Sequence, residues 1–127
     1  MKKIISLIVV AASVIIISCK KNNTGGDCEV AAFPQHHGKS IYGATVYVKF
    51  GAKDLPSNPT SNYDLKIEGE PEEEHVHIKN LRYGHYYLYA VGYDSSIAQT
   101  VVGGIALKIK WKERKKEIDI NVPVTED

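Results

Sequence analysis

The sequence predicts an all-β protein, a single antiparallel β-sandwich of seven strands preceded by an apolar leader and a short tether. Beyond residue 28, β-branched, aromatic and other apolar residues recur at every second position, which is the period of a half-buried strand. Gly, Pro, Asn and Ser separate these runs, as is typical of turns between short strands. The length of 127 residues, of which 43% are hydrophobic, suits one domain.

Residues 42–50 give the clearest strand, because five apolar or aromatic residues alternate there with Gly, Thr, Tyr and Lys. Residues 51–62 are rich in Pro, Ser and Asn and predict a loop, and residues 68–74 predict an acidic turn. No window beyond the leader shows a helical apolar period, so no helix is expected there. The expected strands are 30–36, 42–50, 63–67, 75–79, 86–93, 101–111 and 117–124.

The first nineteen residues indicate export and lipidation. Lys2 and Lys3 precede an unbroken run of apolar and small residues, 4–18, which is shorter than the roughly 20 residues of a membrane-spanning helix and predicts a signal peptide. Residues 16–19, Ile-Ile-Ser-Cys, resemble the lipobox of bacterial lipoproteins. This resemblance implies cleavage before Cys19, diacylglycerol on its thiol and acylation of the new amino terminus, which together hold a domain at a membrane. The alternative is an ordinary secretory signal with an incidental Cys19.

The chain therefore divides into a lipoprotein signal peptide (1–18), the lipidated Cys19 with a flexible tether (19–28) and a β-sandwich domain (29–127). In gram-negative lipoproteins an Asp after the lipidated Cys resembles an inner-membrane retention signal. This chain has Lys20 there, which favours the outer membrane. The tether has no acidic residue before Asp27, which favours a domain facing the periplasm over one at the cell surface. A gram-positive host is a further alternative.

Charge argues against nucleic acid as a partner. The formal net charge is +1, and loss of residues 1–18 would remove two of 16 basic residues and none of 15 acidic ones. A near-neutral, exported domain has no basic bias toward nucleic acid. Lipidation of Cys19 would leave only Cys28, so no intrachain disulfide is expected.

The order of motifs resembles carboxypeptidase-regulatory-like domains, which share a transthyretin-like seven-stranded sandwich. Residues 38–46 (GKSIYGATV) resemble the opening motif of that family, residues 80–88 (NLRYGHYYL) its central segment and residues 117–124 its closing strand. The run 70–74 (EPEEE) replaces a hairpin of the family. The resemblance implies a non-catalytic module for packing, adhesion or assembly.

Five histidines are candidate metal ligands. His75 and His77 are two apart on an expected strand and so share one face. A hairpin would bring His85 close to His77, and His36 and His37 end the first strand. Such imidazoles could bind Zn²⁺ or Cu²⁺ if three or more converge. The alternative is a solvent-facing strand with scattered histidines.

A basic run near the C-terminus is a candidate interaction patch. Strand alternation would place Trp111 on the face opposite the lysines. The run could contact anionic lipid headgroups or an acidic partner, or it could simply be a charged hairpin tip that prevents edge-to-edge association. Its members are Lys108, Lys110, Lys112, Arg114, Lys115 and Lys116.

No pattern predicts catalysis. Ser95 and Ser96 follow Asp94 but lack the Gly-x-Ser-x-Gly setting of a nucleophile. We therefore expect a lipid-anchored, non-catalytic cell-envelope module for binding or assembly, with an envelope protein as a candidate partner and no cofactor beyond the lipid. The alternative is a periplasmic lipoprotein that binds a divalent metal through its histidines.

Overall fold

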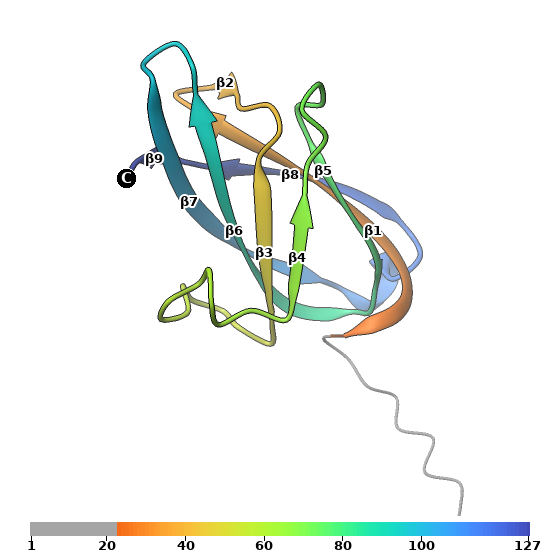
Figure 1. Ribbon diagram of the computed structural model, residues 1–127. Coiled ribbons are helices and arrows are strands. Elements are labelled where there is room, and N and C mark those ends of the chain that lie inside the picture. Colours follow the sequence, from red (N-terminus) through yellow and green to blue (C-terminus); the bar gives the residue numbers. More distant parts are fainter. Residues whose placement is uncertain (1–22) are drawn as a thin grey trace, which may run out of the picture.

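A computed structural model describes residues 23–127, so the signal peptide, Cys19 and the first tether residues lie outside the described part. The described chain is an all-β sandwich of two sheets, which confirms the predicted fold class (Figure 1). The first sheet contains β1 (Thr24–His36), β2 (Lys39–Ser40), β5 (Val76–Leu81) and β8 (Glu117–Pro123). The second sheet contains, in spatial order, β4 (Leu65–Glu68), β3 (Thr45–Phe50), β6 (Gly84–Asp94), β7 (Gln99–Ile109) and β9 (Thr125–Glu126).

The only helical element in residues 23–127 is a short 3-10 turn, η3 (Trp111–Glu113). Within the same residues, no helix has the length and apolar character needed to cross a membrane.

One strand pairing departs from the expected antiparallel sandwich. β8 runs parallel to β1, from the pair Glu29–Glu117 to the pair Gln35–Pro123, whereas the other described ladders are antiparallel. The reason is the connection through η3, which carries the chain from β7 in the second sheet to β8 in the first. Such a crossover between layers permits a parallel pairing that a tight hairpin does not.

Several strand boundaries also differ from the prediction, among them the start of β1, the start of β3 at Thr45 rather than residue 42, and the end of β7. β1 begins at Thr24, so residues 24–28 of the expected tether belong to a strand. Thr24 and Cys28 both pair with Leu81 through a bulge, and Cys28 is fully buried. β7 ends at Ile109 rather than at residue 111, because the Glu113 carboxylate accepts a hydrogen bond from Lys110 N (3.0 Å) and closes the η3 turn.

The core lies between the sheets and follows the predicted alternation. Val46 and Val48 of β3 face Val30 and Ile78 across the sandwich, and all four are almost fully buried. Burying one such side chain stabilises the fold by about 1.5–3 kcal/mol. Close packing reaches the backbone as well, since a Cβ at Gly103 would clash with the Pro123 carbonyl oxygen.

Tyr86 joins the core to the start of the described chain. Its side chain is fully buried, and its hydroxyl shares its one hydrogen between the carbonyl oxygens of Arg82 (2.6 Å) and, more weakly, Asn23 (3.3 Å). Burial raises the pKa of this hydroxyl to about 12. The hydroxyl therefore fastens the β5–β6 corner to the residue that precedes β1.

We expect Tyr86→Phe to lower the free energy of unfolding by about 1 kcal/mol. The substitution removes a buried hydrogen-bond donor, so the carbonyl oxygens of Arg82 and Asn23 each lose a hydrogen bond. Tyr93→Phe is the matched control, since the Tyr93 side chain is 57% exposed. Urea unfolding of both variants measures the difference, and equal effects would contradict this role for Tyr86.

Candidate functional site

The five histidines lie in three separate places. His75 and His77 lie at the start of β5, His36 and His37 at the end of β1, and His85 near the start of β6. β5 and β6 belong to different sheets, so they form no hairpin, and the expected approach of His85 to His77 is wrong. His85 pairs with Lys108 in the β6–β7 ladder and joins neither group of potential metal ligands found among the described residues.

His75 and His77 share one face, as the sequence predicts. Val76 and Ile78 between and beside them point into the core, so both imidazoles point to the outer face of the first sheet. Their Nε2 atoms are 2.7 Å apart. Glu73 Oε2 lies 3.9 Å from His75 Nε2, and the ligand atoms of all three residues lie within 4.8 Å of one another.

Neighbouring residues hold this group in place. Glu73 N donates to the Glu70 carbonyl oxygen (3.0 Å), and Gly43 N donates to the Glu73 carbonyl oxygen (3.2 Å). The Phe33 ring lies 5.2 Å from the His75 ring, measured between centroids. Glu29 Oε1 of β1 lies 3.0 Å from His77 Nδ1.

Sequence reasoning missed Glu73 and Glu29. Composition places Glu73 in the acidic turn, although Glu73, His75 and His77 follow the same two-residue spacing. Glu29 is 48 residues before His77, and only the pairing of β1 with β5 brings the two together. The two-residue spacing is a signal that could have revealed Glu73, but it gives no indication of Glu29.

His36 has a different environment and is almost fully buried. Its Nδ1 lies 2.8 Å from Asp94 Oδ2 and its Nε2 lies 3.2 Å from Glu126 Oε2. An ionised carboxylate can accept hydrogen bonds but cannot donate them. Both ring nitrogens of His36 must then donate, so this geometry favours the doubly protonated imidazolium. The hydrogen bond with Asp94, followed by that with Glu126, raises the pKa of His36, although burial opposes this shift.

Asp94 is the buried counter-charge of His36. Hydrogen bonds from the Ser96 hydroxyl and from His36 hold the pKa of Asp94 well below its ordinary value of 3.8. Lys39 Nζ lies 3.8 Å from its other carboxylate oxygen. The His36–Asp94–Glu126 group thus ties the end of β1 to the ends of β6 and β9. His36, His37 and Glu126 are close enough together for a metal site, but an imidazolium at His36 has no lone pair to offer one.

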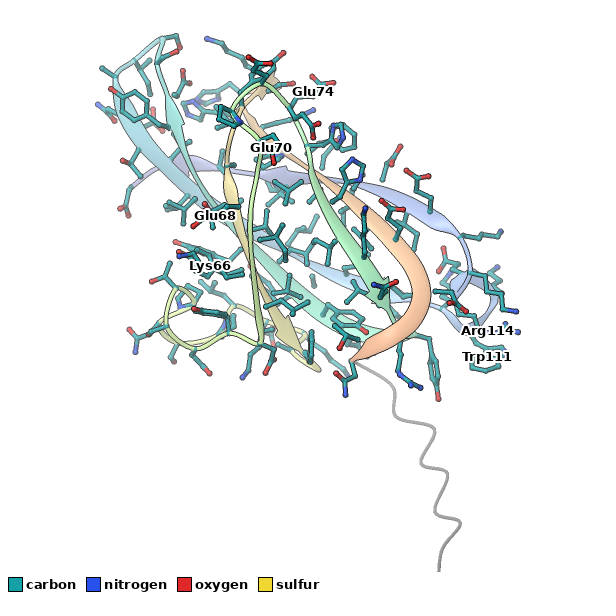
Figure 2. All side chains as sticks on the ribbon, turned by 45° about the vertical axis from the view of Figure 1, so that its right-hand side comes forward. Lys66, Glu68, Glu70, Glu74, Trp111 and Arg114 are labelled. Carbon is teal, nitrogen blue, oxygen red and sulfur yellow. The ribbon has the colours of Figure 1, made fainter. Side chains whose placement is uncertain are left out.

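The basic run surrounds η3. Lys108, Lys110 and Lys112 are exposed as expected, but Trp111 is not on an opposite strand face. Trp111 opens the 3-10 turn, is 59% exposed, and lies under the Arg114 guanidinium at 4.0 Å from the ring centroid (Figure 2). The Tyr83 ring packs edge-on against the Trp111 ring, with 4.9 Å between the ring centroids.

This patch lies next to the start of β1. Gly25, Gly26 and Asp27 line the same open hollow as Trp111 and basic side chains of the run. We call this surface the tether-end surface; its members are Arg82, Tyr83, Trp111, Arg114 and Lys115, together with residues 25–27. It places aromatic and cationic groups where the tether joins the fold.

Comparison of the chain with protein-family models gave no match, and a search of curated proteins gave none either. The resemblance to carboxypeptidase-regulatory-like domains therefore stays a prediction from the residues.

We expect His36→Asn to destabilise the fold in a pH-dependent way. Because the pKa of His36 is raised above 6.5, its contribution is complete below about pH 6.5 and is lost as the pH rises through the folded-state pKa. The contribution of Asp94, whose pKa is lowered from 3.8, is present above about pH 4 and is lost as the pH falls through its folded-state pKa. The loss of stability in the variant should therefore be largest between about pH 4 and 6.5.

Denaturant unfolding at pH 5.5 and 8.5 measures this effect, with the exposed neighbour His37→Asn as the control. A loss of stability in His36→Asn that is equal at both pH values would contradict the ion-pair role.

Proposed function

We propose that this protein is a lipid-anchored, non-catalytic module of the cell envelope, held at the outer membrane on its periplasmic side and serving binding or assembly. The observation that carries the proposal is the position of β1, which begins at Thr24, five residues beyond Cys19. Five residues span at most about 18 Å. A lipid on Cys19 would therefore keep the start of the sandwich close to the membrane.

The tether-end surface supports this arrangement. Exposed Trp111 beside Arg114 and Lys115 has the composition of groups that lie at a membrane–water interface, where each basic residue near anionic lipid contributes about 1 kcal/mol. Stable attachment of a protein commonly combines acyl chains with a basic patch. The lipid on Cys19 and this surface would provide these two contributions on the same side of the domain.

The local chemistry around Ser96 supports a non-catalytic role. The Ser96 hydroxyl donates to Asp94 rather than to an imidazole, and His36 Nε2 faces Glu126. A nucleophilic serine needs a neighbouring base to take its proton, and here the acid stands between the serine and the histidine. The arrangement of Ser96, Asp94 and His36 therefore suits a structural ion pair that holds the end of β1 against the end of β6.

We expect Cys19→Ala to abolish incorporation of labelled palmitate and to release the protein from the membrane fraction. Cys28→Ala is the matched control because Cys28 is fully buried in the core and should keep its label. Labelling that persists in Cys19→Ala would overturn the lipoprotein assignment.

We also expect Trp111 to lie at the bilayer surface. It is the only tryptophan of the chain, so its fluorescence reports on this position alone. With the lipidated protein in vesicles that contain anionic lipid and a headgroup-attached quencher, Trp111 emission should be quenched, and Arg114→Glu should reduce the quenching. Lys66→Glu, on the remote β4 strand (Figure 2), makes the same charge change and should not. Vesicle-bound protein without quenching would show that this surface faces away from the membrane.

A further inference from the structure

We propose that Glu73, His75 and His77 bind one divalent transition-metal ion of the zinc class, and that Glu29 positions His77 for this role. The site goes beyond the lipid-anchored function and does not depend on it. Two imidazole nitrogens and one carboxylate oxygen form a ligand set that is typical of zinc.

One of the two imidazoles directs a lone pair into the space between the rings. With Nε2 atoms 2.7 Å apart, only one of them can carry a hydrogen toward the other. His77 Nδ1 is shielded from solvent and has no aligned hydrogen-bond partner, and the Glu29 carboxylate 3.0 Å away favours a proton on it. His77 Nε2 is then the unprotonated nitrogen that can bind a metal. His75 becomes a second ligand when its proton lies on Nδ1.

The distances suit a single ion. Zn–N and Zn–O bonds of 2.0–2.2 Å in a tetrahedral site separate neighbouring ligand atoms by about 3.3 Å. The observed separations of 2.7 Å between the imidazoles and 3.9 Å between Glu73 and His75 lie on either side of that value. Small side-chain rotations therefore bring the three ligand atoms to coordinating positions.

The backbone beneath the ligands is fixed. Val76 and Ile78 are buried in the core, so the β5 backbone that carries His75 and His77 cannot turn them away from the outer face. Ala31 lies opposite His77 in the β1–β5 ladder, so the pairing with β1 also holds this backbone. An ion would therefore meet one ligand on β5, one directly before it and one on a loop tied by backbone hydrogen bonds.

Nearby carboxylates attract a cation to this point. Glu68, Glu70 and Glu73 line an open depression of about 190 Å³ together with both imidazoles, and Figure 2 shows Glu68, Glu70 and Glu74 following one another along this edge. A concentration of one charge raises the local concentration of the opposite ion. The imidazoles favour zinc-class ions over Ca²⁺, which prefers six or more oxygen ligands. Three protein ligands leave a fourth position for water or for a group from a partner.

The test is a Zn²⁺ titration of the lipidated full chain in detergent. We expect one ion per chain, with binding weakened at least about a hundredfold in the His75→Asn, His77→Asn double variant and clearly weakened in Glu73→Gln. His85→Asn and His37→Asn are the matched controls and should bind as the wild type does. Retained stoichiometry and affinity in the double variant, or equal losses in the controls, would overturn the site.

Glu29 requires a separate measurement, since its proposed role is positioning. Glu29→Gln should weaken Zn²⁺ binding about tenfold to a hundredfold, the usual effect of losing the partner of a metal-bound histidine. The visible spectrum of Co²⁺ bound in place of Zn²⁺ should keep its four-coordinate form in that variant, and Glu29→Asp should restore affinity in part. A changed spectrum would make Glu29 a ligand and contradict the positioning role, as would unchanged affinity. Thermal unfolding of each variant without metal checks that the fold is retained.

Discussion

The central constraint of this sandwich is the alternation of inward and outward side chains along β1. The strand pairs with β2, β5 and β8, so its register sets the positions of all the other strands of the first sheet. Its inward residues Val30 and Ala32 are fully buried in the core. Its outward residues Glu29 and Phe33 contact the two imidazoles of β5. A slip of one residue would exchange these two sets, and the core and the candidate metal site would be lost together.

The sequence predicted what depends on local periodicity. Alternation with a period of two was sufficient for the all-β class, for the β3 core residues Val46 and Val48, and for the common face of His75 and His77. It was not sufficient where distant segments meet. The parallel pairing of β8, the separation of His85 from His77 and the contact of Glu29 with His77 all depend on which sheet receives each strand. The η3 turn at Trp111 is closed by hydrogen bonds from Lys110 N to the Glu113 carboxylate and from Glu113 N to the Lys110 carbonyl oxygen, and alternation carries no signal of them.

The two candidate surfaces lie at opposite ends of β5. Leu81, at one end, pairs with Thr24 and Cys28 beside the tether, whereas Val76, at the other, pairs with Ala32 beside the histidines. Six residues of strand separate these ends by roughly 20 Å. A domain held to a membrane by its tether-end surface would therefore present the acidic edge and its imidazoles away from the lipid. The near-neutral net charge conceals this polarity, because the basic and acidic groups are numerous but lie apart.

The parallel pairing of β1 with β8 also affects the order of folding. Glu29 and Glu117 are neighbours in this ladder, although 88 residues separate them in the sequence. Contacts of such long sequence separation slow folding, because the entropy of closing the loop is lost before the contact forms. β1 precedes β8 in the sequence, so the pairing of the two waits until β8 has been synthesised. During that interval one edge of β1 lacks the backbone hydrogen bonds that β8 later supplies.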